Sequence, residues 1–165
     1  MVKVIEGGKL ECETIRALLD FNVENKRFQT IIEGMGNGLM VTNEDLEVIL
    51  HNPALMQLLE LREEIKTPTA VTEIIRDEAL IRTLKKILQG KVDEGVPVTQ
   101  EIRIGERTLR AVSTPSLGLD RNVFFRISGT LTIFEDVTIF KEFDRMKSDF
   151  VNLVAHGLRS PLVSI

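Results

Sequence analysis

The sequence predicts an α+β fold with five strands and several short helices, flanked by N-terminal and C-terminal coiled-coil-like helices. Three observations lead to this class. Two short β-like runs and three longer ones are rich in alternating apolar residues, the pattern of half-buried strands. Short helical segments separate the two groups of strands. At both ends of the chain, apolar residues instead recur every three or four positions, as in an amphipathic helix.

The first segment, residues 9–33, is expected to be helical. Its core-type positions follow the spacing of a two-helix seam, and they are Leu18, Phe21, Asn25, Phe28 and Ile32. A polar residue such as Asn25 in a seam tends to set register and oligomer state. A single helix that packs on its own domain explains the same pattern equally well, so both interpretations stay open. The glycines within residues 34–38 end this helix.

Short strands and helices follow. The expected strands are 39–42, 46–51, 96–104, 108–116 and 123–134, and the expected helices are 54–59 and 77–90. Pro53 suits the first turn of its helix, and Gly90 suits the position after the end of the second helix. Gly105-Glu106 is a tight hairpin signal between the third and fourth strands.

A long helix is expected to begin at residue 139. Its seam positions are Ile139, Phe143, Met146, Phe150 and Leu153. Thr138 is a good N-cap, because its hydroxyl can accept a hydrogen bond from an otherwise unpaired N–H. Pro161 lacks an N–H, and its ring crowds the carbonyl of Gly157 four residues back. We therefore expect a kink beside His156.

Composition limits the possible classes of protein. At 165 residues the chain has room for one ordinary domain with helical extensions, and 43% hydrophobic with 28% charged residues is typical of a soluble globular protein. A net charge of −4 argues against binding to nucleic acid. The single cysteine, Cys12, excludes an internal disulfide and fits a reducing compartment. We expect a cytoplasmic location, although a parent protein could be attached to a membrane outside this segment.

Residues 28–138 resemble a PAS sensor domain. The opening Phe28-x-x-Ile31-Ile32-Glu33, the later Asn52-Pro53-Ala54 and the closing Asp136-Val137-Thr138 carry the resemblance. Asn43 stands where the family often has an aspartate. The resemblance implies a PAS fold over residues 33–138, which is a five-stranded antiparallel sheet with short helices on one face. This domain lies between an N-terminal helix over 1–32 and a partial dimerisation and phospho-acceptor helix over 139–165. It also implies a small pocket for a small-molecule ligand, and a signal-relay role for Asp136 and Thr138.

Residues 147–164 resemble the phospho-acceptor box of sensor histidine kinases. The run from His156 to Leu162 matches His-(Glu/Asp)-Leu-Arg-(Ser/Thr)-Pro-Leu at every position but one, since Gly157 stands where the family carries an acid. The resemblance implies that His156 is the phospho-acceptor and that Gly157, Arg159 and Pro161 flank it. For a histidine without such neighbours, a surface position on a coiled coil would be the better interpretation.

The two resemblances imply the sensor and signal-relay fragment of a histidine kinase of a two-component system, acting as a homodimer. In that family the box histidine attacks the γ-phosphate of ATP on a separate catalytic domain, and the phosphoryl group then passes to a response regulator. No cofactor is evident in this chain, and ATP and Mg²⁺ are expected for that catalytic domain. Since the sequence ends at Ile165 without such a domain, we expect it to be inactive alone.

Two alternatives compete with this function: a PAS dimerisation module of a non-kinase regulator, and a pseudo-kinase scaffold, which Gly157 keeps open. The sequence gives little support for a cofactor in the domain. A haem needs an axial ligand, and His51 at a strand end fits a satisfied polar residue better. Cys12 lies outside the domain, which disfavours a flavin–cysteine photosensor. The acidic pairs at 77–78 and 93–94 fit solvated surfaces, and no metal site is predicted.

Overall fold

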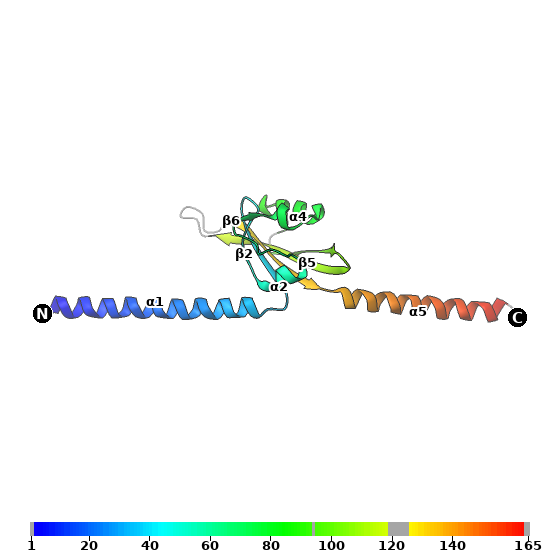
Figure 1. Ribbon diagram of the computed structural model, residues 1–165, viewed down its shortest axis with the longest axis horizontal. Coiled ribbons are helices and arrows are strands. Elements are labelled where there is room, and N and C mark those ends of the chain that lie inside the picture. The colour runs from blue at the N-terminus through cyan, green and yellow to red at the C-terminus, as the bar shows by residue number, and fades with distance from the viewer. Residues whose placement is uncertain (1, 94, 119–125, 164–165) are drawn as a thin grey trace. The chain divides into compact units, whose positions relative to one another are not determined.

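The structure is a computed structural model that describes the backbone of residues 2–93, 95–118 and 126–163, and the side chains within residues 13–93, 95–118 and 126–159. The Cys12 and Pro161 side chains, and Glu94, lie outside these described parts. The chain divides into two compact units, Met1–Gly36 and Asn37–Ile165. The first unit contains helix α1 (Val2–Gly34), which ends at the predicted glycines (Figure 1).

The second unit is built on one antiparallel sheet in the order β3-β2-β1-β6-β5-β4. The strands are β1 (Gly38–Asn43), β2 (Glu47–His51), β3 (Thr69–Ala70), β4 (Val98–Ile104), β5 (Arg107–Gly118) and β6 (Arg126–Asp136). The helices are α2 (Pro53–Leu58), α3 (Val71–Ile74), α4 (Glu78–Leu88) and α5 (Thr138–Val163). The predicted α+β class with an antiparallel sheet is therefore confirmed.

The expected number of five strands is wrong, because the sheet has six. The additional strand is β3, which pairs with Glu47 and Val48 of β2. Only two residues belong to β3, so no alternation of apolar and polar residues could reveal it in the sequence. The short helix α3 follows it directly and was likewise not predicted.

Two side-chain caps start the helices that cover the sheet. The Asn52 carboxamide oxygen accepts from the N–H of Leu55, 3.1 Å away, at the start of α2, and also from the N–H of Leu39 in β1. Asp77 caps α4 by accepting from the N–H of Leu80 at 2.8 Å. Asp77 is half-buried and Glu78 is exposed, and the Asp77 carboxylate has the added role of satisfying a helical N–H that would otherwise be unpaired.

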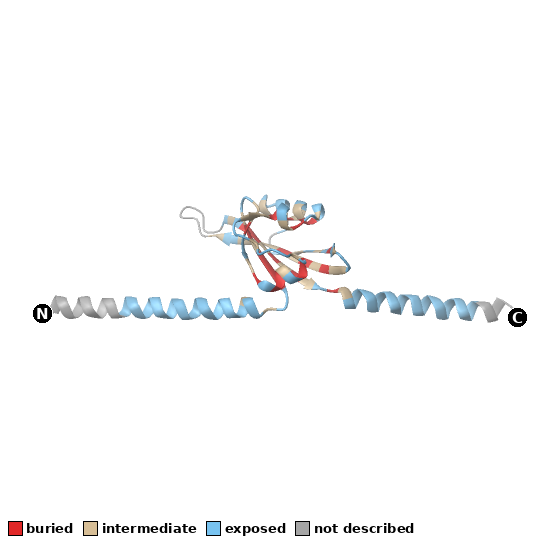
Figure 2. Ribbon diagram, in the orientation of Figure 1, coloured by how far each residue is buried: buried red, intermediate tan, exposed pale blue. Residues whose placement is uncertain are grey.

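The core lies between the sheet and helices α2, α3 and α4 (Figure 2). Its largest fully buried side chains include Phe134, Met40, Leu55, Ile75, Leu80 and Leu84. The same face of the sheet carries two buried hydroxyl pairs, Thr42 with Thr130 at 2.8 Å and Ser113 with Thr132 at 2.9 Å. Each hydroxyl has a hydrogen-bond partner, as buried polar groups require.

Helix α5 presents its apolar residues to solvent. The five predicted seam residues Ile139, Phe143, Met146, Phe150 and Leu153 are between 62% and 78% exposed. On α1, the seam residues Leu18, Phe21 and Phe28 are also exposed. An apolar stripe on a long helix is stabilised by burial against another surface. Neither stripe obtains that burial within its own unit.

In the part of the chain that the structure describes, no helix combines the length and the apolar character that crossing a bilayer requires.

Candidate functional site

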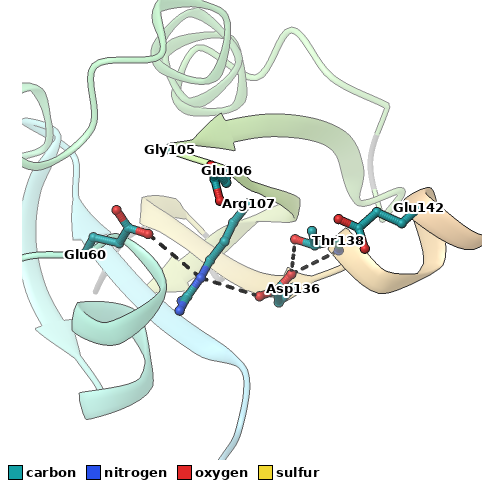
Figure 3. Close-up of a pocket in the computed structure, with 7 residues that line it drawn as sticks. All are labelled: Glu60, Gly105, Glu106, Arg107, Asp136, Thr138 and Glu142. Carbon is teal, nitrogen blue, oxygen red and sulfur yellow. Dashed lines mark hydrogen bonds and ion pairs between the residues drawn. The ribbon is translucent and has the colours of Figure 1, made fainter.

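The end of β6 and the start of α5 form a hydrogen-bonded junction (Figure 3). Oδ1 of Asp136 accepts from the backbone N–H of Thr138 at 3.0 Å and from the Thr138 hydroxyl at 2.5 Å. The same hydroxyl accepts from the backbone N–H of Thr108 in β5 at 3.0 Å. The junction therefore ties the first residue of α5 both to the last residue of β6 and to the neighbouring strand.

The prediction of Thr138 as the N-cap named the wrong acceptor for an N–H at the start of α5. Its hydroxyl accepts from Thr108 in β5, and it is the Asp136 carboxylate that accepts from a backbone N–H at the start of α5. A carboxylate near a helix N-terminus is also favoured by the helix dipole. The capping function at this helix thus belongs to the aspartate of the Asp136-Val137-Thr138 sequence.

Arg107, at the start of β5, connects this junction to helix α2. Its Nε lies 4.0 Å from Oδ2 of Asp136 and 3.9 Å from Oε1 of Glu60, just beyond the end of α2. Its Nη1 donates to the backbone carbonyl of Gln57, in the last turn of α2, at 3.1 Å. Arg107 therefore contacts both the end of β6 and the end of α2, and Figure 3 shows it between Asp136 and Glu60.

The surroundings of Asp136 favour its charged form. The hydrogen bond from the Thr138 hydroxyl and then the one from the Thr138 backbone N–H hold the pKa of Asp136 below its ordinary value of 3.8. The positive charge of Arg107 lowers this pKa as well, whereas partial burial acts in the opposite direction. The Asp136 carboxylate is therefore ionised at neutral pH and can hold both Thr138 and Arg107.

Two further contacts attach α5 to the β4–β5 hairpin. The buried Val137 donates its N–H to the carbonyl of Thr108 at 2.9 Å. Lys141, in the first turn of α5, forms an ion pair of 2.7 Å with Glu101 of β4. A movement of the hairpin would therefore act on the base of α5 at more than one point.

A surface pocket of about 590 Å³ opens over the junction. It is lined by Glu60, Gly105, Glu106, Arg107, Asp136, Thr138 and Glu142. Four of these side chains are carboxylic acids and one is a guanidinium, so the chemistry available here is the exchange of ion pairs. Among the described residues, no three His, Cys, Asp or Glu side chains are grouped so that they could hold a metal ion.

The residues of the predicted phospho-acceptor box lie along α5, away from this junction in sequence. His156, Gly157 and Arg159 are all exposed, and among the described residues His156 makes no hydrogen bond or ion pair. A Cβ added at Gly157 would meet no heavy atom within 4 Å. Pro161 belongs to the backbone of α5. The predicted relay residues and the box are thus joined by one helix.

His51 is engaged within the domain. Its Nε2 lies 3.3 Å from the carbonyl oxygen of Ile65, so that nitrogen is the donor of the pair. The other ring nitrogen, Nδ1, is buried and has no partner among the described residues.

The sequence did not indicate the partners of the relay residues. Arg107, Glu60, Glu101 and Lys141 were not singled out, because each lies far in sequence from its partner or reads as an ordinary surface charge. The register that pairs Leu109 with Asp136 brings Arg107 and Thr108 to the junction. The predicted hairpin at Gly105-Glu106 was the one available signal that a charged residue would begin β5 nearby.

Comparison with known sequences finds similarity to PAS domains and to sensor histidine kinases. The sequence model of the family described as "PAS domain" matches residues 26–92. The alginate biosynthesis sensor protein KinB of Pseudomonas aeruginosa is 25% identical over 100% of this chain and 29% of its own length. The sensor histidine kinase WalK of Bacillus subtilis is 24% identical over 86% of this chain and 22% of its own length. The chain thus spans less than a third of these curated relatives.

Solved structures show the same fold. The PAS domain of BvgS from Bordetella pertussis has a TM-score of 0.51 at 18% identity, covering 78% of this chain and 97% of that domain. A PAS domain from Colwellia psychrerythraea has a TM-score of 0.54 at 17% identity, over 68% of this chain and 96% of that chain. The sensor region of a sensor histidine kinase has a TM-score of 0.51 at 17% identity, covering 63% of this chain and 40% of that chain.

Proposed function

The chain contains a PAS domain that resembles the sensor regions of histidine kinases, and we propose that it passes a signal from this domain through helix α5 to a phospho-acceptor histidine, His156. The observation that carries the proposal is the continuity of α5. One helix, Thr138–Val163, begins at the hydrogen-bonded junction with Asp136 and includes the box from His156 to Pro161.

The distance along α5 decides how a signal could travel. His156 lies eighteen positions after Thr138, which corresponds to about 27 Å at the rise of an α-helix. No side chain spans that distance, so a signal must move or rotate the helix as a body. The junction is suited to this, because Thr108, Asp136 and Glu101 hold the first turn of α5 by hydrogen bonds and an ion pair.

The exposed apolar stripe of α5 supports a homodimer. Phe143, Phe150 and Leu153 follow the spacing of a two-helix seam and are all more than 60% exposed. A second copy of the same helix would cover them with an identical stripe, as in a parallel coiled coil. In the dimer a rotation of α5 would change how the two His156 side chains are presented.

His156 would act as the nucleophile. A neutral imidazole has a free lone pair on one ring nitrogen, and the exposure of His156 leaves that nitrogen open to the γ-phosphate of ATP. The ATP and its Mg²⁺ would be held by a separate catalytic domain. The phosphoryl group would then pass to a response regulator, and we place this chemistry in the cytoplasm.

Gly157 favours a second candidate, a pseudo-kinase scaffold that dimerises without phosphoryl transfer. The histidine kinase box carries an acid at this position, which can orient the imidazole and accept its proton. Glycine has no side chain for either task. In this case α5 would carry the signal to a partner through its helix alone.

Phosphoryl labelling separates the two candidates. The chain would be incubated with γ-phosphate-labelled ATP and a histidine kinase catalytic domain supplied in trans, as wild type and as His156→Gln. Label that is acid-labile and absent from His156→Gln supports the kinase segment. No label in either form, from a catalytic domain that labels its own acceptor helix, would support the scaffold.

A further inference from the structure

Arg107 lies between two carboxylates. Its Nε is too far from either of them to form a hydrogen bond. The Nε atom is 3.9 Å from Oε1 of Glu60 and 4.0 Å from Oδ2 of Asp136 (Figure 3). Both distances exceed the upper end, about 3.2 Å, of ordinary N–H···O bonds. Because the guanidinium lies between the two acids, a movement that closes one pair lengthens the other.

Glu60 is held in an unusual position at one side of this arrangement. Its φ of 56° lies in the left-handed region, which is unfavourable for a residue with a Cβ. Its carboxylate lies 3.2 Å from the position that a Cβ on Gly105 would take, so the hairpin tip approaches it closely. Glu60 directly follows Leu59, the C-cap of α2, and the N–H of Leu61 donates to the carbonyl of Met56 at 3.0 Å, so the end of this helix fixes the conformation of Glu60.

Helix α2 links this arrangement to the core. Its buried residues Leu55 and Leu58 pack in the core, and its last turn offers the Gln57 carbonyl to Nη1 of Arg107. The Gln57 carbonyl also accepts from the backbone N–H groups of Leu59 and Glu60, so Arg107 adds a further donor at this helix end. A displacement of α2 by a change in the core would therefore move the groups that hold Arg107.

We propose that Glu60 and Asp136 compete for Arg107, and that this competition couples the position of α2 to the start of α5. When Arg107 moves toward Glu60, Asp136 keeps only its bonds to Thr138. When Arg107 moves toward Asp136, the carboxylate that caps α5 is held more firmly. This inference deepens the proposed function, since it names the side chains that would carry a change in the core to the relay helix.

Amide hydrogen exchange in the 165-residue chain tests the competition. Glu60→Gln frees Arg107 for Asp136, so exchange at the Thr138 amide should slow about threefold, the size of an exposed ion-pair effect. Asp136→Asn frees Arg107 for Glu60, so exchange at the Leu59 amide should slow by a similar factor. Coupling between two sites is reciprocal, so the two effects must appear together.

Two further variants separate competition from a general effect of charge. Glu106→Gln removes an equal charge from the lining of the same pocket, and among the described residues Glu106 forms no ion pair. It should leave exchange at Thr138 unchanged. Adding Arg107→Gln to Glu60→Gln should abolish the slowing at Thr138, because the guanidinium that transmits it is gone.

The competition would be overturned if Glu60→Gln left exchange at Thr138 unchanged, if Glu106→Gln reproduced its effect, or if the effect persisted without Arg107. These measurements need no phosphoryl transfer. A negative result in hydrogen exchange would therefore not contradict phosphorylation of His156. A failure to label His156 would likewise not contradict the competition for Arg107.

Discussion

Phe134 and Phe143 are the same residue type in opposite environments. Phe134, on β6, is completely buried against α2–α4, whereas Phe143, on α5, is 63% exposed. The sheet domain satisfies its own apolar residues, as Figure 2 shows by the buried residues concentrated there. Helix α5 instead displays an apolar stripe that its own unit does not cover. The sheet domain thus has its own core, whereas the apolar stripe of α5 is free to pack against another surface.

The largest effect should come from the buried member of this pair. Phe134→Ala removes a fully buried ring and should lower the free energy of unfolding by about 3–5 kcal/mol. Urea unfolding followed by the NMR signals of β6 would measure it. Phe143→Ala is the matched control and should change the unfolding of the sheet by no more than about 0.5 kcal/mol. Equal losses would show that α5 is part of the same core.

Formation of the proposed homodimer should depend on Phe143, the exposed phenylalanine of this pair. Phe143→Ala should weaken the proposed homodimer by about 30-fold, the effect of losing a side chain worth about 2 kcal/mol at an interface. Phe140→Ala is the control, since Phe140 is equally exposed but lies off the seam. Sedimentation over a range of concentrations would compare them, with a chain that ends before Phe140 as the limiting case. A wild-type chain that stays monomeric would contradict the dimer.

Gly157 offers a test of how the exposed helix would be used. An acid at this position can serve as a general base, which is worth roughly 10²- to 10⁴-fold in rate. Gly157→Glu should therefore raise phosphorylation of His156 at least tenfold, and the open space around Gly157 leaves room for the new side chain. The measurement uses saturating ATP and a complete catalytic domain.

Gly157→Ala separates this base from an effect on the helix. Alanine supplies no carboxylate, yet it improves helix propensity by about 1 kcal/mol relative to glycine. It should leave the phosphorylation rate close to that of the wild type. If Gly157→Ala accelerated the reaction as much as Gly157→Glu, helix stiffness rather than a base would be the missing contribution. If neither changed the rate, Gly157 would be a neutral departure from the family pattern.

The smallest expected effect is the dependence of the junction on pH. Because the folded-state pKa of Asp136 is lowered, its contribution to stability is present above the unfolded-state pKa and is lost as the pH falls through the folded-state value. The NMR shift of the Thr138 amide should therefore be constant near neutral pH and titrate with a midpoint below 3.8. The same step should be absent in Asp136→Asn. A midpoint above 3.8 would contradict the hydrogen-bonded carboxylate.

Local patterns in the sequence predicted most of the fold. Alternation located five strands, and Pro53 and Gly90 marked helix ends that the structure places within one or two residues. The strand β3 was not predicted, because an alternation of apolar and polar residues cannot be recognised in only two residues. Periodicity also could not show that Asp77 caps α4, because the cap depends on the exact residue at which the helix begins.

Within the candidate site, the sequence predicted only the contacts between residues that are close together in the chain. Asp136 and Thr138 are two residues apart, so their contact follows from the sequence. The partners Thr108, Arg107 and Glu60 come from β5 and the end of α2, and their approach depends on sheet register and packing. These are tertiary properties that one sequence does not determine by spacing alone.

The central claim is that the junction at Asp136 couples the PAS domain to His156, and Asp136→Ala in the full-length protein tests it most directly. The free energy of unfolding should fall by no more than about 2 kcal/mol, the upper end of the cost of a lost helix cap, while the rate of His156 phosphorylation should change. Glu135→Ala is the control, since Glu135 pairs with Arg110 on the same strand and touches neither Thr138 nor Arg107. A rate for Asp136→Ala equal to that of the wild type and of Glu135→Ala would contradict the account.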